Sequence, residues 1–110
     1  MEKRIGKIKK ARFGHGGYQD AMIGVSFDLG SDKDGWGVGD FWGAWAIDRS
    51  GYCKWTEADR IAQIGGAVMR LNAVLNDAKV AKVDELAGIP IEATFDGNTL
   101  KEWRVLTEVI

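Results

Sequence analysis

The residues best suited to acid–base or nucleophilic chemistry are a single histidine, His15, and a single cysteine, Cys53. Histidine is the commonest general acid or base, and a thiolate beside a histidine is a strong nucleophile. His15 lies in a glycine-rich turn where no neighbour in the sequence orients its ring, and Cys53 meets it only if the fold brings the two together. The sequence therefore predicts a binding protein that is not an enzyme, with no catalytic residue assigned.

A second group of candidates is a cluster of aspartates around a glycine-rich segment. Close carboxylates can hold calcium or magnesium, but the segment lacks the Asp-x-Asx-x-Asx-Gly run and the closing glutamate of a calcium loop. We therefore predict an acidic hairpin tip with no metal and no cofactor. The glycine-rich runs at 14–17 and 35–39 do not join a strand to a helix, as nucleotide-binding loops do, although their amides can form a small anion site. The four aspartates are Asp28, Asp32, Asp34 and Asp40.

Aromatic and arginine side chains give the strongest indication of a ligand site. Four large aromatic residues fall within ten positions, and at strand spacing Trp42 faces opposite to Phe41 and Trp45. A single core can bury only one face of this strand, so a bound base or a second subunit would cover the aromatic residues on the other face. Alternatively, the tryptophans simply pack a small sheet against a helix. Base stacking on an aromatic ring contributes about 1 to 3 kcal/mol, and arginines hold phosphates. The predicted ligand-binding residues are Arg12, Trp36, Phe41, Trp42, Trp45, Arg60 and Arg104, with Arg49 as a further arginine candidate.

A small antiparallel sheet must position these candidates, and hydrophobic alternation predicts it. The first strand is basic and is predicted as a bulged edge strand, with Gly6 at the bulge. A long flexible loop is expected over residues 30–40, and a hairpin turn at Asp96-Gly97-Asn98. The predicted strands span residues 3–13, 21–29, 41–47, 89–95 and 100–110.

One long helix is predicted over residues 57–80, because apolar residues recur there at steps of three and four. Thr56 is a suitable N-cap, with acidic residues in the first turn. The interior pair Gly65-Gly66 costs about 1 kcal/mol per glycine relative to alanine, so we expect close packing of the helix at this point. The element order β-β-β-α-β-β predicts a single α+β domain over residues 1–110, with about five antiparallel strands packed on one helix.

Composition and charge narrow the class of protein. The chain has 110 residues, of which 45% are hydrophobic and 28% charged, as in one globular domain. No apolar run is long enough to span a bilayer and no secretory signal core is present, so we expect a cytoplasmic protein with no membrane contact. The net charge is only −1, yet the first twelve residues carry six basic side chains against one acidic. This strand indicates an anionic partner, or a solvated edge whose lysines discourage sheet aggregation.

Four runs carry a resemblance to a known family: FGHGGYQDAMIG at residues 13–24, GWGVGDF at 35–41, WTEADR at 55–60 and WRVLTE at 103–108. They resemble short proteins encoded in phage and prophage genomes, which implies a phage origin and action in the host cytoplasm. Less specifically, the chain is similar to phage anti-defence sponges of the Thoeris-inhibiting type. Those are small oligomers that sequester cyclic ADP-ribose-like or cyclic oligonucleotide signals.

These observations lead to three alternative hypotheses for the function. The first is a phage anti-defence sponge for host immune evasion, which stacks the base of a nucleotide-derived signal on aromatic rings and holds its phosphates with arginines, without turnover. The second is an inhibitor of a host defence enzyme that uses residues 30–45 as its contact patch. The third is a single-strand nucleic-acid binder that uses the basic first strand, against which the near-neutral net charge argues. We also predict a symmetric homo-oligomer with Gly65-Gly66 near its interface.

Overall fold

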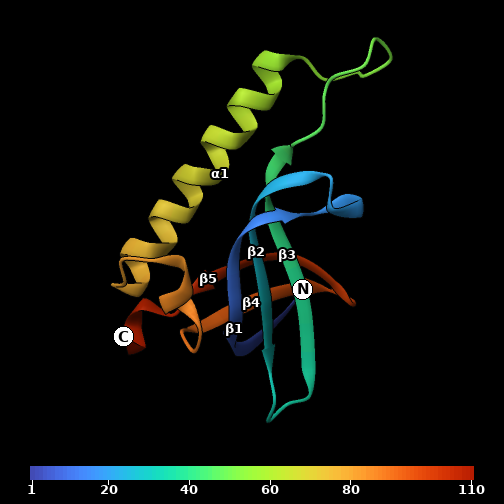
Figure 1. Cartoon of the computed structure of the whole chain (residues 1–110). Coiled ribbons are helices and arrows are strands. Elements are labelled where there is room, and N and C mark those ends of the chain that lie inside the picture. Colours follow the sequence, from blue (N-terminus) through green and yellow to red (C-terminus); the bar gives the residue numbers. More distant parts are fainter.

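A computed structural model describes all 110 residues and has an α+β fold, in which a five-stranded antiparallel sheet packs on one long helix (Figure 1). The order β-β-β-α-β-β confirms the predicted architecture. The predicted last strand is too long, because β5 ends at Val105 and a turn of 3-10 helix follows. The elements are β1 (Glu2–Gly16), η1 (Tyr18–Asp20), β2 (Met22–Ser31), β3 (Trp36–Trp45), α1 (Glu57–Ala78), η2 (Val83–Leu86), β4 (Pro90–Asp96), β5 (Thr99–Val105) and η3 (Thr107–Val109).

β1 is the middle strand of the sheet, in the order β3-β2-β1-β4-β5, and this corrects the prediction of an edge strand. Its first half, residues 2–7, pairs with β4, whereas its second half, residues 7–16, pairs with β2. The strand bends between the two halves (Figure 1), and the bulge lies between Ile8 and Lys10 and not at Gly6. Glycine is needed at position 6 for close packing of the backbones, because a Cβ there would lie 2.5 Å from a backbone carbonyl oxygen of β2.

The outermost strands of the sheet, β3 and β5, meet on its inner side, so the sheet curls into a half-open barrel. Trp42 of β3 stacks on Trp103 of β5, with ring centroids 5.3 Å apart and planes 13° apart. The Asp40 carboxylate accepts hydrogen bonds from both indole nitrogens, at 3.1 and 2.8 Å, and Phe27 packs edge-on against both rings. Arg70 of α1 places its guanidinium 4.1 Å from the centre of the Trp42 ring. We call Phe27, Asp40, Trp42 and Trp103 the aromatic clamp.

The hairpin of β2 and β3 is longer than the sequence predicts. β2 continues to Ser31 and β3 begins at Trp36, so residues 30–40 are mostly strand and not a flexible loop. The backbone N–H of Asp34 donates to the Ser31 hydroxyl at 3.1 Å, and Gly35 completes the turn with a φ of 73°. Alternating glycines hid the strand because glycine has a low strand propensity, which ladder pairing with β2 overrides.

α1 begins with a capping box, and its N-cap is Thr56, as predicted. The Thr56 hydroxyl accepts a hydrogen bond from the backbone N–H of Asp59, and the Asp59 carboxylate accepts one from the backbone N–H of Thr56. These hydrogen bonds from Thr56 lower the pKa of the Asp59 carboxyl below its ordinary value. The helix start is therefore fixed locally, next to the loop that joins it to β3.

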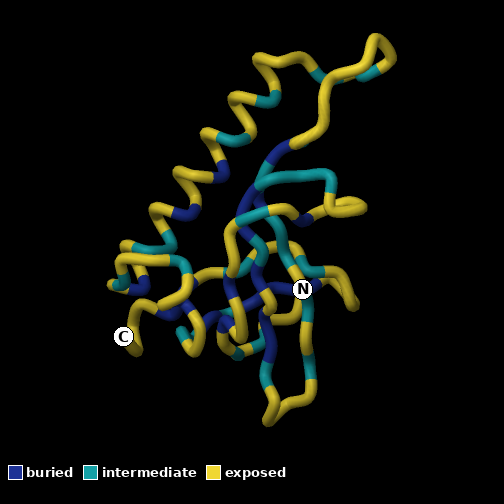
Figure 2. The backbone as a smooth tube through the Cα atoms, viewed as in Figure 1, coloured by how far each residue is buried: buried dark blue, intermediate teal, exposed yellow.

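α1 packs on β3 and β2 and, near its end, on β5, through the buried residues Ala67, Leu71 and Ala78. Figure 2 shows that buried residues gather where the inner face of the sheet meets the helix, while the opposite side of the helix is exposed. Gly65 and Gly66 lie on that exposed side with no atom near their missing Cβ positions, so the prediction of close packing there is wrong within one chain. α1 is too polar to be a membrane-crossing helix, and no other helix is long enough.

Candidate functional site

Alternation along β3 divides the predicted aromatic ligand residues between the two faces of the sheet. Trp36 and Trp42 point to the inner face, whereas Phe41 and Trp45 point to the outer face, as the strand spacing predicts. Trp42 is buried in the aromatic clamp, and Trp36 packs edge-on against Phe95 with ring centroids 5.5 Å apart. The inner pair is therefore part of the core, and the outer pair remains accessible for a ligand.

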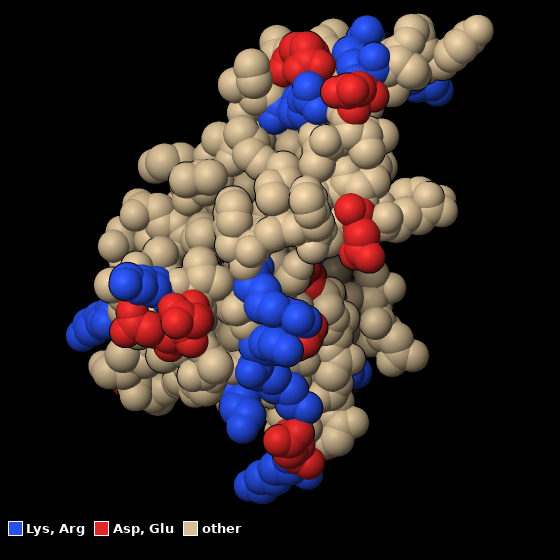
Figure 3. Space-filling view, in the orientation of Figure 1, with Lys and Arg blue, Asp and Glu red and all other residues tan.

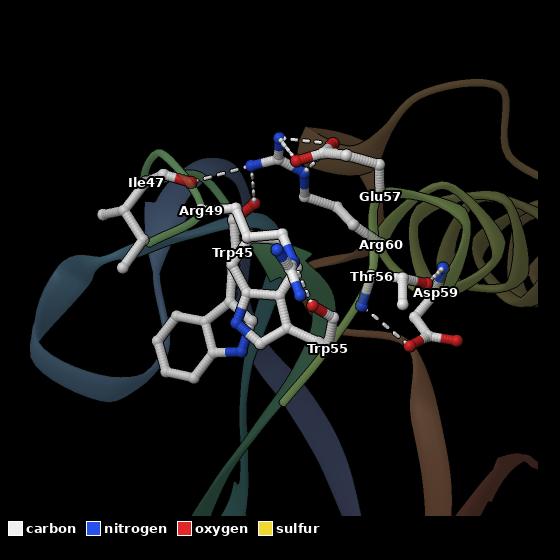
Figure 4. A network of polar contacts seen from close by, with 8 residues as sticks. All are labelled: Trp45, Ile47, Arg49, Trp55, Thr56, Glu57, Asp59 and Arg60. Carbon is white, nitrogen blue, oxygen red and sulfur yellow. Dashed lines mark hydrogen bonds and ion pairs between the residues drawn. The ribbon is translucent and has the colours of Figure 1, made fainter. Parts of the chain in front are cut away.

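Arg60 joins the start of α1 to the loop before it (Figure 4). Its Nη1 donates to the carbonyl oxygens of Trp45 and Ile47, at 3.3 and 2.8 Å. Its Nη2 and Nε donate to the carboxylate of Glu57, and its guanidinium lies 5.0 Å from the centre of the Trp55 ring. All three nitrogens of Arg60 are thus engaged within the protein, which gives this arginine a structural role.

Two other candidate arginines are also engaged within the chain. Arg49 donates to two backbone carbonyl oxygens of the loop before α1 (Figure 4). Arg104 lies between Glu108 and Glu92, at 3.0 and 3.2 Å, and its hydrogen bonds to these carboxylates raise the pKa of its guanidinium. Arg104 in turn lowers the pKa of the Glu108 carboxyl. Arg12 is the one member of the predicted arginine set that forms no hydrogen bond or ion pair.

Arg12 lies on the outer face of β1, in line with residues from two further strands. Its cross-strand neighbour is Ser26 on β2, whose neighbour on β3 is Phe41. Neighbours of this kind have Cβ atoms about 5 Å apart. The next row along the same face begins with Lys10, whose neighbour on β2 is Asp28. The sheet therefore brings a free guanidinium, a hydroxyl and an aromatic ring together on one surface, which we call the outer face.

Basic side chains form a band along β1, and Figure 3 shows Lys and Arg gathered over this strand. Lys9 and Lys7 reach the carboxylate of Asp32, at 2.7 and 4.0 Å, and Lys9 lowers the pKa of that carboxyl by hydrogen bonding to it. Lys10 and Arg12 are exposed and have no acidic partner. The band thus ends in two free positive charges on the same face of the sheet as the half-buried aromatic residues of β3.

Glycines make room for the aromatic residues of the outer face. A Cβ at Gly16 would lie 3.0 Å from the Phe41 ring, and one at Gly43 would lie 2.8 Å from it, so the ring rests where side chains on β1 and β3 are missing. Trp45 lies further along β3 and meets Tyr18 of η1 edge-on, with centroids 6.5 Å apart. Phe41 and Trp45 are half-buried, and Tyr18 is exposed. These rings provide a surface on which flat groups can stack.

A shallow hollow of about 410 Å³ adjoins Arg12 on the outer face. Its other walls are the backbone of residues 13–17 and the side chains of Ser26 and Asp20. Arg12 and Ser26 are suitable partners for a phosphate, whereas the Asp20 carboxylate is a hydrogen-bond acceptor for a ribose or base. The glycine-rich turn, predicted as a possible anion site, therefore borders the only predicted arginine that is free.

The other groups considered for chemistry are not brought together. Asp40 belongs to the aromatic clamp, while Asp32 pairs with Lys9, and nowhere in the chain do three or more His, Cys, Asp and Glu side chains gather as metal ligands. The Cys53 thiol lies 3.4 Å from the Ser50 hydroxyl and not beside His15. That hydrogen bond lowers the pKa of the Cys53 thiol.

Sequence reasoning missed three members of the outer face: Lys10, Ser26 and Tyr18. Lys10 and Arg12 lie on the outer face, opposite to Ile8, only because the bulge resets the alternation of β1 after Ile8, and a bulge position is not visible in the sequence. Ser26 was detectable, since it lies on the polar side of the cleanly alternating second strand. Tyr18 follows the glycine turn and reaches Trp45 only through the fold.

Comparison of the chain with protein-family models, with curated proteins and with solved structures finds no significant match. The fold is therefore described from its connectivity. The first strand is bent and shared between the halves of the sheet, and the third strand faces the fifth, so the connectivity resembles that of a half-open barrel of the OB type. A fold of this type hosts several functions, so the function must be argued from the outer face itself.

Proposed function

We propose that the protein binds single-stranded nucleic acid on the outer face of β1, β2 and β3, without turnover. The observation that carries this proposal is the row Arg12, Ser26 and Phe41, which places a free guanidinium on β1 in line with a half-buried ring on β3. Proteins that bind single strands combine basic groups that follow the backbone with rings on which bases stack. The outer face supplies basic groups along β1 and aromatic rings along β3.

The linear arrangement of the basic band favours an extended strand over a compact ligand. Lys10 and Arg12 are two residues apart on one face of β1, which separates them by about 7 Å along the strand. Successive phosphates of an extended single strand can contact successive basic side chains of this kind. The net charge of −1 does not oppose the proposal, because acidic residues such as Glu57 and Glu108 lie on other elements. Salt also screens the interaction between exposed charges that lie more than about 10 Å apart.

The type of barrel supports the same surface by analogy. In OB-type barrels, oligonucleotides bind on the face of the second and third strands, near the loop that joins the first two. Here the half-buried rings Phe41 and Trp45 lie on β3, and the exposed ring of Tyr18 lies in the loop between β1 and β2. The analogy adds support for this surface, while the alignment of Arg12, Ser26 and Phe41 across three strands carries the proposal.

Fluorescence anisotropy with a labelled oligothymidine tests the proposal. We expect salt-dependent binding, and each phosphate contact should contribute about 0.7 to the slope of log affinity against log salt. Arg12→Ala should weaken binding and reduce the slope by about one such contact, whereas the matched control Lys101→Ala, an exposed lysine of β5, should change neither. Absence of binding at low salt, or equal effects of the two variants, would contradict the proposal.

A second candidate is the phage anti-defence sponge, which would sequester a cyclic nucleotide-derived immune signal in the host cytoplasm. The hollow beside Arg12 favours it, because a volume of about 410 Å³ is in the range of small-ligand sites. Calorimetry with cyclic and ADP-ribose-type adenine nucleotides tests this candidate, and intact ligand should be recovered after heat denaturation. Binding of an oligothymidine but of none of these signals would eliminate the sponge and retain the nucleic-acid binder.

A homo-oligomer is a further part of the proposal. Ile61 and Met69 are each about two-thirds exposed on α1, and Gly65 and Gly66 leave room for a close contact with another chain. Figure 3 shows a broad uncharged area over the helix between charged groups at its two ends. Large exposed apolar side chains gathered on one helix are typical of interaction sites. Light scattering should give at least a dimeric mass, and a monomeric mass at micromolar concentration would contradict this part.

A further inference from the structure

The second half of β1 has one edge that pairs with no strand. Residues 9–16 pair with β2 on one side only, and the last backbone bonds on the other side are those of Ile8 with Gly88 and Ile89. Beyond Ile8, no other backbone hydrogen bond leaves this side of the strand. A free edge of this length presents N–H and C=O groups in a form that an added strand can complete.

Beside this edge, the inner face of β1 is buried as far as Ala11 and is uncovered at Phe13 and His15. α1 packs on β3 and β2 and makes few contacts with β1, which leaves Phe13 54% exposed although it points to the inner face. His15, two residues further, borders a hollow of about 510 Å³ with Ile61 and Ile64 of the helix. Val68, one turn beyond Ile64 on the same flank, is 48% exposed. The free edge therefore lies against an open apolar gap between strand and helix.

The charge of the edge restricts what can fill this gap. Lys9, Lys10 and Arg12 are exposed along the free segment, and the last two point to the outer face. An added strand would place its inward side chains against Phe13 and Val68, and its outward side chains beside Lys10 and Arg12. Edge-to-edge pairing with β1 of a second copy would instead oppose basic side chains with basic ones, which disfavours it.

We propose that the free edge of β1 and the facing flank of α1 form a docking site for an extended segment of a partner protein, in which acidic and apolar residues alternate. The segment adds a strand to β1, buries its apolar side chains against Phe13 and Val68, and pairs its acidic side chains with Lys10 and Arg12. The site differs from the nucleic-acid surface in its apolar part, because Phe13 and Val68 lie on the inner side and Phe41 on the outer side. Substitutions can therefore remove peptide binding at the docking site without removing nucleic-acid binding on the outer face, and the reverse.

The test uses an acetylated, amidated octapeptide that alternates glutamate and valine, with hydrogen exchange of the backbone amides as the readout. We expect binding that slows exchange of amides within residues 9–16. Val68→Ser and Phe13→Ser alter exposed side chains and should each weaken peptide binding about tenfold, and Val68→Ser, which is remote from the outer face, should retain oligothymidine binding. The matched control Val109→Ser, also at an exposed valine but in η3, should leave both unchanged.

Two peptide controls separate strand addition from simple charge attraction. The same peptide with alternate backbone nitrogens methylated should lose binding, because it cannot complete the edge, and so should a peptide that alternates lysine and valine. Equal binding of the methylated peptide, protection confined to other elements, or no binding at millimolar peptide would each overturn the docking site. Failure of oligothymidine binding with intact peptide binding would contradict the proposed function alone.

Discussion

The two faces of β3 use the same kinds of side chain for opposite purposes. On the inner face, Trp42 has its indole nitrogen bonded to Asp40, its ring stacked on Trp103 and its other side covered by Arg70. On the outer face, the Phe41 ring rests on glycines. Its cross-strand neighbour is Ser26, whose own neighbour on β1 is Arg12 with a free guanidinium. The inner ring is satisfied within the chain, whereas the outer ring and its charged neighbour are not.

The comparison shows that aromatic residues identify a binding surface only when their partners are known. Polar atoms of buried rings are paired, and a ring that closes a barrel from one outer strand to the other stabilises the fold. Exposed rings beside unpaired cations instead match the requirements of a nucleotide ligand. Substitutions on the two faces should therefore separate stability from binding.

The largest expected effect is that of Trp42→Ala on the inner face. Loss of this buried ring removes the stack with Trp103 and the joint between β3 and β5, which should lower the free energy of unfolding by about 3 to 5 kcal/mol. Urea denaturation measures the change. Oligothymidine affinity of the molecules that remain folded should be close to that of the wild type; a loss of affinity with unchanged stability would assign Trp42 to the binding surface.

Asp40→Ala should have the next largest effect. It leaves the indole N–H groups of Trp42 and Trp103 without their acceptor in a half-buried site, at a cost of about 1 to 3 kcal/mol in unfolding free energy. Asp40→Asn is the matched variant, because its side-chain oxygen can still accept from an indole and should retain part of the stability. Equal destabilisation by the two variants would argue against the hydrogen bonds as the cause.

On the outer face, Phe41→Ala should reverse this pattern. The unfolding free energy should change little, since the ring is half-buried on glycines, whereas oligothymidine binding should weaken by about 1 to 3 kcal/mol through loss of base stacking. Anisotropy titration and urea denaturation of the same sample give both numbers. Phe41→Trp retains a ring and should preserve binding. A variant that unfolds but binds normally when folded would contradict the assignment of Phe41.

The smallest effects are expected at the capping box, which belongs to neither face. Thr56→Ala should lower the unfolding free energy by about 1 kcal/mol. The pKa of Asp59 is lowered in the folded state, so its contribution to stability is complete above the pKa of the unfolded chain and is lost as the pH falls through the lower folded pKa. Asp59→Asn should remove this part of the pH dependence, as urea denaturation at pH 7 and pH 3 can show.

Local patterns predicted the fold well and the site only in part. Alternation along the second strand, the Thr56 cap and the helical periodicity each act within a few residues, and they yielded the element order and the opposite orientations of Trp42 and Phe41. The bulge after Ile8 and the approach of β3 to β5 depend on contacts between distant segments. These contacts decide that Trp42 is core.

The same limit applies to the arginines. Arg60 and Arg104 are occupied by groups that the sequence does not place beside them, namely the carbonyl oxygens of Trp45 and Ile47 for Arg60 and the Glu92 carboxylate for Arg104. Arg12 forms no ion pair because its cross-strand neighbour on β2 is Ser26, whereas Asp32 lies beside Lys9 at the other end of the paired segment. Availability of a charge is a property of tertiary structure, which composition alone cannot indicate.

The five indole N–H signals of the protein test the central claim most directly. Titration of oligothymidine into protein labelled with ¹⁵N at the tryptophan side chains should shift the signal of Trp45, which lies on the outer face, and leave those of Trp42 and Trp103 in place, because Asp40 holds them on the inner side. A shift of the Trp42 and Trp103 signals with that of Trp45 unchanged, or no shift at all at saturating oligonucleotide, would contradict the claim that the outer face binds single strands.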